Sequence, residues 1–127
     1  MAADVVSYSA KMREDELDTI GRLSKLGKLI KKTAADHNGR IFNRAGDGFL
    51  LEFSSPVAAV RCGYDLQLKL REPTTQEEVG LDVRVGIHLA DVLVDGTDLL
   101  GDGVNVASRI EAEAEPGMVL ISNSVFD

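Results

Sequence analysis

Residues 40–53 have the sequence RIFNRAGDGFLLEF, in which two largely apolar runs flank a short turn. A Gly-Asp-Gly tip between runs of apolar residues is typical of a β-hairpin. The sequence therefore predicts a strand over Arg40–Arg44, a turn over Ala45–Gly48 and a second strand over Phe49–Phe53.

A helix is expected on each side of this hairpin. Residues Glu14–Asp36 carry apolar side chains every three to four positions, which is typical of an amphipathic helix. Asn38-Gly39 follows this stretch and supplies a residue for the left-handed conformation that ends a helix. After the hairpin, Ser55-Pro56 combines an N-cap residue with a first-turn proline, so a second helix is predicted from there to about Arg71.

Further strands are expected before the first helix and after the second. Met1–Val6 has the character of the end of a strand, and Leu81–Leu89 alternates strictly between apolar and polar or small residues. Between the second helix and this alternating strand, Glu72–Gly80 is predicted to be a polar connection. The chain then bends towards a short strand over Val92–Val94.

The remaining sequence predicts a third helix that starts near Asp102 or Gly103 and ends before Pro116, and a last strand over Val119–Ile121. Two β-α-β units with right-handed crossovers around one hairpin form a ferredoxin-like sheet with helices on one face. The expected fold class is therefore α+β, an α/β sandwich with a ferredoxin-like βαββαβ core and an additional αβ unit. In this topology the first strand lies beside the hairpin, so Asp4 and Asp47 are expected to meet at one edge of the sheet.

The composition excludes several classes of protein. The 127 residues are 44% hydrophobic and 28% charged, which suits one soluble domain spanning residues 1–127. No apolar run approaches the roughly 18 residues of a membrane span. A net charge of -7 argues against a general nucleic-acid surface. Cys62 is the only cysteine, which suits a reducing cytoplasm, and its apolar helical context predicts a packing role.

Asp4 and Asp47 form a candidate metal site. Hard cations such as Mg²⁺ take oxygen ligands and bind few protein carboxylates together with substrate phosphates. Two adjacent aspartates repel each other unless a cation or a shared proton neutralises them. Taken singly, Asp47 is equally a turn aspartate and Asp4 a solvated strand end.

Asn105 and Arg109 form a second candidate pair in the predicted third helix. They are four residues apart, so they project from the same helical face. Arginine holds phosphate oxygens with a rigid fork, and asparagine can hydrogen-bond a ribose. The alternative is a solvated helix face with an exposed arginine. Asp102 fits the first turn of that helix better than a ligand position.

Four motifs occur along the chain: ADVVSYS at residues 3–9, GDGF at residues 46–49, RVGIH at residues 84–88 and GDGVNVASR at residues 101–109. In this order they resemble the signatures of the class III adenylate/guanylate cyclases, and the last of them is the most specific. The resemblance covers essentially the whole chain and implies the nucleotide cyclase fold.

The resemblance also implies an activity and its residues. Asp4 and Asp47, with the backbone carbonyl of Val5, would bind two Mg²⁺ or Mn²⁺ ions. Asn105 would orient the ribose, and Arg109 would stabilise charge on the phosphate. The implied reaction converts ATP, or GTP, to the 3′,5′-cyclic monophosphate and pyrophosphate.

In that family the site is shared between two protomers, so the resemblance implies a head-to-tail homodimer. Base recognition departs from the pattern, because Asn43 stands where adenylate-type members have lysine and guanylate-type members have glutamate. Asparagine can hydrogen-bond either purine. Asp98 matches the other base-reading position of adenylate-type members and favours ATP.

Two more positions depart from the family pattern. Ser7, in the loop expected to bind the phosphates, and Ala90 both replace a usual glycine. The family also continues past Asp127 into a segment with a phosphate-binding lysine, so the domain is expected to be incomplete at both ends. Two other functions therefore stay open: a degenerate cyclase-homology domain that binds nucleotide or a partner without turnover, and an interaction module whose aspartates only shape turns.

Overall fold

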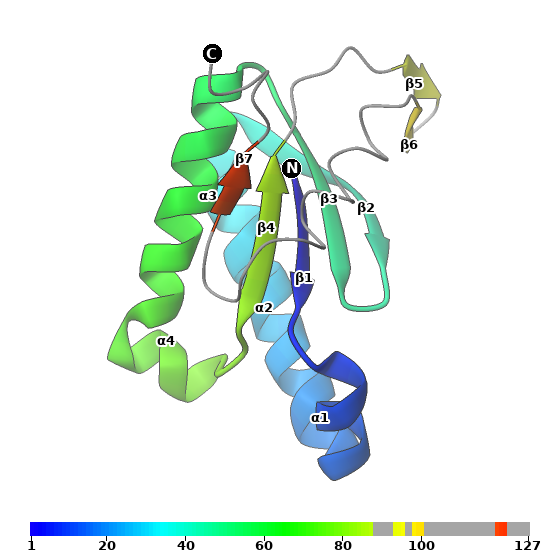
Figure 1. Cartoon of the computed structure of the whole chain (residues 1–127), viewed down its shortest axis with the longest axis vertical. Helices are drawn as coiled ribbons and strands as arrows, with labels where there is room; N and C mark the ends of the chain where they lie inside the picture. Colours follow the sequence, from blue (N-terminus) through cyan, green and yellow to red (C-terminus); the bar gives the residue numbers. More distant parts are fainter. Residues whose placement is uncertain (88–92, 96–97, 101–118, 122–127) are drawn as a thin grey trace.

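The structure, a computed structural model, describes residues 1–87, 93–95, 98–100 and 119–121. In these residues the main sheet has the strand order β2-β3-β1-β4-β7. Figure 1 shows the strands side by side in that order. Their bounds are β1 (Ala2–Val5), β2 (Gly39–Ala45), β3 (Gly48–Phe53), β4 (Val83–Ile87) and β7 (Val119–Ile121).

The sheet has the ferredoxin-like topology expected from the sequence. β1 pairs antiparallel with β3 on one side and β4 on the other, and β2 pairs antiparallel with β3. β7 adds to the edge of β4 in the parallel direction. The α+β prediction and the last strand at Val119–Ile121 are therefore confirmed. The third helix predicted from Asp102 lies outside the described residues.

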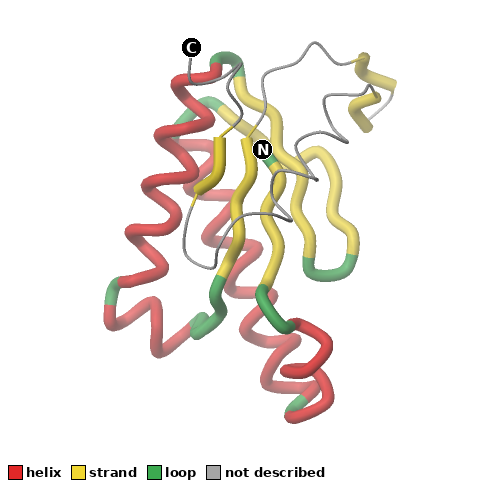
Figure 2. Tube along the Cα trace, viewed as in Figure 1, coloured by secondary structure: helices red, strands yellow, loops and turns green. Residues whose placement is uncertain are grey.

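The two long helices, α2 (Glu16–Asp36) and α3 (Pro56–Arg71), cover one face of this sheet, as Figures 1 and 2 show. Two short helices lie beyond one end of the sheet in Figure 1: α1 (Tyr8–Glu14) precedes α2, and α4 (Pro73–Glu78) follows α3. The hydrophobic core lies between the helices and the sheet. Its most deeply buried large side chains come from both layers, and they include Leu26, Ile30, Leu66, Phe49 and Val85.

The ends of the long helices follow the sequence signals. The Ser55 side chain accepts a hydrogen bond from the Ala58 N–H at 3.1 Å, and Pro56 occupies the first turn of α3. That helix ends at Arg71, as predicted. Asn38 has a φ of 59° and supplies the left-handed residue between α2 and β2.

The end of α2 is fastened to α3 by charged side chains. His37 Nε2 lies 3.1 Å from Asp65 Oδ2, and Lys69 Nζ lies 3.4 Å from the same oxygen. The hydrogen bond to His37 is the main cause that lowers the pKa of the Asp65 carboxyl. His37 thus has a structural partner on the neighbouring helix.

Two helices and one strand were not predicted. The sequence favoured a single helix starting at Glu14, but Asp15 is extended and accepts a hydrogen bond from the Asp18 N–H at 3.1 Å. This cap starts a new helix and leaves α1 as a separate element. The predicted connection Glu72–Gly80 contains α4, whose polar residues carry no apolar periodicity.

The short strand expected at Val92–Val94 is β5 (Leu93–Asp95), one residue later. It pairs antiparallel with β6 (Asp98–Leu100), which the sequence analysis missed. Both strands are only three residues long, too short to show a period of two.

Cys62 lies in the core, as predicted, with 1% of its surface exposed. Burial, with a smaller contribution from the Asp65 carboxylate, raises the pKa of its thiol to about 12. The thiol is therefore neutral at physiological pH and acts as a small apolar group. Within the described part of the chain, no helix has the length and apolar character needed to cross a bilayer.

We expect Leu66→Ala to lower the free energy of unfolding by about 3 kcal/mol, because Leu66 is fully buried between α3 and the sheet. The matched control is Leu68→Ala on the same helix, where 45% of the side chain is exposed. Both variants change helix propensity equally, so the control is expected to lose less than about 1 kcal/mol. Urea unfolding followed by circular dichroism measures both, and equal losses would contradict the core described here.

Candidate functional site

The sheet register brings Asp4 and Asp47 to the same end of the sheet. Asp4 on β1 lies directly opposite Gly48 on β3, and Asp47 is the residue before Gly48. In Figure 1 the end of β1 and the β2–β3 turn lie at the same edge. In sequence, α1, α2 and β2 lie between the two aspartates. The pairing of β1 with β3 brings them together in space.

The turn that carries Asp47 is tight. Ala45 pairs with Gly48, so Gly46 and Asp47 alone connect β2 to β3. Gly46 has a φ of +59°, a conformation that glycine adopts without steric cost. Asp47 is partly exposed at the tip of the hairpin. Its position is therefore set by a short turn between two paired strands rather than by a long loop.

Asp4 points away from the helices. Its neighbours Ala3 and Val5 belong to the core, and successive side chains of a strand lie on opposite faces. On the other side of β1, Arg84 of β4 is the register partner of Asp4. The Arg84 Nε donates a hydrogen bond to Asp4 Oδ1 at 3.2 Å, and the two side chains are 31% and 26% exposed.

Arg84 lies in the RVGIH motif at residues 84–88, but the sequence alone assigns it no role. The only signal in the sequence is that Arg84 occupies the polar phase of the alternating strand. Which acidic residue it meets depends on how β4 pairs with β1, and this register is a property of the folded sheet.

The residues at this edge fit a hard divalent cation. Two partly exposed carboxylates, those of Asp4 and Asp47, lie at this end of the sheet. Within the described residues no group of three or more His, Cys, Asp or Glu side chains is placed to hold a metal, so the chain itself would supply few ligands. An ion bound here would take its other ligands from backbone carbonyls, water and substrate phosphates, as Mg²⁺ and Mn²⁺ do. Val5 follows Asp4, and its side chain has no ligand atom, so its backbone carbonyl is the group suited to such a role.

Ser7 ends the two-residue loop between β1 and α1 in a left-handed conformation, with φ 57° and ψ 36°. This conformation costs a residue with a Cβ about 1–2 kcal/mol, which glycine avoids. The loop is held to the residue before β4, because the Val6 N–H donates to the Asp82 carbonyl at 2.9 Å. Ser7 is exposed at the same end of the sheet as Asp4.

A β-bulge places Asn43 on the same face of the sheet as Asp4. The register between β2 and β3 shifts between Ile41 and Asn43, so that Asn43 pairs with Leu50. Leu50 in turn lies opposite Ala2, two residues before Asp4 and therefore on the same face. Asn43 is exposed there, two strands away from β1. The structure does not bring Asn43 beside Asp4.

The other predicted site residues belong to the second half of the chain. Asn105 and Arg109 lie outside the described residues, and so does Ala90. Asp98 is the first residue of β6, and its backbone pairs with Asp95 of β5.

A comparison with known protein families bears directly on this arrangement. Residues 1–127 match the family described as "Adenylate and Guanylate cyclase catalytic domain". The chain belongs to this family. The cyclase domain therefore has the fold and the family that its four motifs indicated.

Individual relatives agree with this assignment. The cyclase domain is 42% identical over 130 residues to the protein named "Putative adenylate cyclase 3" of Rhizobium meliloti, a match that covers 100% of this chain. The solved structure of an adenylate/guanylate cyclase/hydrolase from Silicibacter pomeroyi is 38% identical and has a TM-score of 0.83 over 98% of this chain and 74% of that one.

A rhodopsin-guanylyl cyclase catalytic core with converted specificity, solved in complex with ATPαS, has a TM-score of 0.87 at 23% identity over 98% of this chain and 75% of that one. At this identity the likeness concerns the fold. The cyclase domain spans 22% of the length of the Rhizobium relative.

We expect Ser7→Gly to raise the free energy of unfolding by about 1 kcal/mol, because it removes the strain of a left-handed serine. The matched control is Ser24→Gly, an exposed serine in the middle of α2, which is expected to lower stability by about 0.5–1 kcal/mol because glycine disfavours a helix interior. Thermal or urea unfolding measures both variants. Changes of the same sign in the two would contradict the strain assigned to Ser7.

Proposed function

We propose that the cyclase domain converts ATP to the 3′,5′-cyclic monophosphate and pyrophosphate. The observation that carries this proposal is the register that sets Asp4 opposite Gly48, beside Asp47. Family membership supplies the reaction class, and this register gives the two carboxylates a common location. The proposed setting is the cytosol, in cyclic-nucleotide signalling.

In the proposed reaction the ribose 3′-oxygen attacks the α-phosphorus, the 3′-hydroxyl loses its proton, and the bond from the α-phosphorus to the bridging oxygen breaks to release pyrophosphate. Asp4, Asp47 and the Val5 carbonyl would hold two Mg²⁺ or Mn²⁺ ions. When bound, such ions supply Lewis-acid activation of the 3′-hydroxyl and neutralise charge on the triphosphate. Asn105 would orient the ribose and Arg109 would stabilise charge on the phosphate.

Arg84 has a proposed role that follows from its contact with Asp4. The guanidinium fixes one oxygen of the Asp4 carboxylate at 3.2 Å and places a permanent positive charge beside a pair of like charges. It would hold the carboxylate in one orientation before substrate binds. The hydrogen bond from Arg84 Nε is made to Oδ1, and the carboxylate would bind a cation through its other oxygen.

The active site is proposed to form between two copies of the chain, arranged head to tail. Family membership supports a site that combines Asn43 of one copy with the aspartates of the other. Asn43 and Asp98 would read the purine, and Ser7 would lie near the phosphates. Asp98 supports ATP as the substrate, while Asn43 leaves GTP as the second purine to assay.

A degenerate domain that binds nucleotide without turnover is the second candidate. It is favoured by Ser7, which keeps a strained conformation where the family usually has glycine, and by Asn43. The geometry at Asp4 favours the enzyme, because a domain without turnover has no need to keep two carboxylates and a guanidinium at one sheet edge.

We expect the whole gene product to form cyclic AMP from ATP with Mn²⁺ or Mg²⁺, and we expect Asp47→Ala to lower the rate roughly a few hundredfold, because one carboxylate of the metal pair is lost. Liquid chromatography of the nucleotide products, with ATP and GTP in parallel, measures the rate.

The control is Asp36→Ala, which removes an exposed carboxylate at the far end of α2 with only a 3.9 Å contact to Lys69. It is expected to keep the wild-type rate. A dimeric protein that binds ATP but forms no cyclic product would favour the degenerate domain.

The shared site makes a separate prediction. Asp47→Ala and Arg109→Ala, each nearly inactive alone, are expected to regain up to about a quarter of the wild-type activity when mixed, because one of the two sites in a mixed dimer then has both groups intact. The measurement is the cyclase rate against mixing ratio. Two variants that stay inactive in every mixture, although they exchange subunits, would contradict a site shared between copies.

A further inference from the structure

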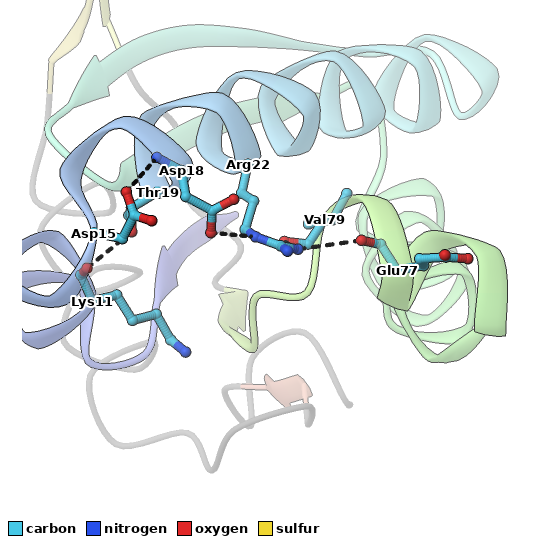
Figure 3. Close-up of polar contacts among 7 residues, drawn as sticks. All are labelled: Lys11, Asp15, Asp18, Thr19, Arg22, Glu77 and Val79. Atoms are coloured by element: carbon cyan, nitrogen blue, oxygen red, sulfur yellow. Dashed lines mark hydrogen bonds and ion pairs between the residues drawn. The ribbon is translucent and has the colours of Figure 1, made fainter.

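Arg22 of α2 caps the end of α4 from outside. Its Nη1 donates to the carbonyl oxygens of Glu77 and Val79, at 3.3 Å and 3.2 Å. The last carbonyls of a helix lack partners within the helix, and a basic side chain can satisfy them. Asp18, one turn earlier on α2, accepts from Arg22 Nε at 2.8 Å and orients the guanidinium. Figure 3 shows Arg22 extended from α2 between these partners.

The turn after α4 is packed directly against this guanidinium. Gly80 has a φ of +58°, and a Cβ at this position would lie 2.6 Å from Arg22 Nη1 and 3.0 Å from the Gln76 carbonyl oxygen. The next residue, Leu81, is buried in the core. Arg22 therefore limits where the chain can turn between the end of α4 and the start of β4.

Two of the four residues that follow Gly80 contact the candidate site. The Asp82 carbonyl accepts from the Val6 N–H at 2.9 Å, at the base of the Ser7 loop. Arg84 pairs with Asp4. A displacement of the turn would move both contacts together, because Asp82 directly precedes β4 and Arg84 is its second residue.

The same part of α2 also holds α1. The Thr19 hydroxyl donates to the Lys11 carbonyl at 3.0 Å, and Asp15 caps the first turn of α2. Thr19 and Arg22 are three residues apart and lie on neighbouring positions of the helix surface. Figure 3 shows the two contacts along one stretch of α2. The first turns of α2 thus contact both α1, which follows the Ser7 loop, and the end of α4, which precedes the turn at Gly80.

We propose that Arg22 is a positioning residue of the cyclase site. It fixes the start of β4 relative to β1, so that Arg84 meets Asp4 and the Val6–Ser7 loop stays at the sheet edge. This inference rests on the proposed function. A lysine could not replace Arg22 fully, because one ammonium group lacks the planar fork that reaches Asp18 and two carbonyls together.

Amide hydrogen exchange of the whole protein tests the positioning without reference to activity. In Arg22→Gln we expect exchange of the Val6 amide to rise about tenfold through local opening. The Leu51 amide, which donates to the Met1 carbonyl at 2.8 Å on the other side of β1, is expected to keep its rate. Lys25→Gln, exposed one turn further on α2, is the matched control and is expected to change neither amide.

Two results would overturn the inference. If exchange rises only at the end of α4, near Val79, then Arg22 is a cap without influence on the site. If the exchange rates of the Val6 and Leu51 amides rise together, then Arg22 contributes only to global stability. Arg22→Lys keeps the charge and is expected to raise the exchange rate of the Val6 amide, as Arg22→Gln does. It replaces Arg22→Gln in this test if the glutamine variant folds poorly.

Kinetics test the link to Arg84. We expect Arg22→Gln to lower kcat/KM roughly 10- to 100-fold, as small misplacements of active-site groups do. In the Arg84→Met background the same change should lower kcat/KM by a smaller factor than in the wild type, because one of the two groups that Arg22 positions is gone. If the loss of kcat/KM in the double variant equals the product of the losses in the two single variants, the inference is overturned. A wild-type protein that makes no cyclic product would instead refute the proposed function.

Discussion

The pairing of β1 between β3 and β4 is the constraint on which the site depends. Only four residues long, β1 forms hydrogen-bonded ladders on both sides, and these ladders place Asp4 opposite Gly48 and opposite Arg84. A slip of one residue would turn Asp4 into the core and Ala3 out of it, because side chains alternate between the two faces. Burying an unpaired carboxylate is costly, so the hydrophobic pattern of β1 and the location of the aspartate enforce each other.

The site takes its precision from short connections. Asp47 lies on a two-residue turn, and Arg84 lies four residues after a turn that a glycine and an arginine hold in place. Neither residue lies on a long loop. A long loop would leave its position relative to Asp4 poorly fixed. The Ser7 loop is the exception, since it stores backbone strain in a position where glycine would have none. Strain of this kind often accompanies binding sites, where the surrounding structure maintains it.

Electrostatics explain why the carboxylate pair requires the groups around it. The chain has a net charge of -7, and two aspartates at one edge would repel each other. Arg84 offsets part of this repulsion within the chain. A divalent cation would offset more, and it would also make a polyanionic substrate acceptable to an acidic protein. The proposed function and the charge of the domain are thus compatible.

The sequence by itself determined the order of the main strands, both long helices and the hairpin, because apolar periodicity, caps and glycines are local signals that each segment carries alone. Its four motifs indicated the family. It failed at α1, α4 and β6, which are too short to show a period. It also named Asp4 and Asp47 but could not assign Arg84 or Arg22. The partners of these arginines come from strands and helices distant in sequence, so only the packed sheet, through its register, decided which acidic group and which carbonyls they meet.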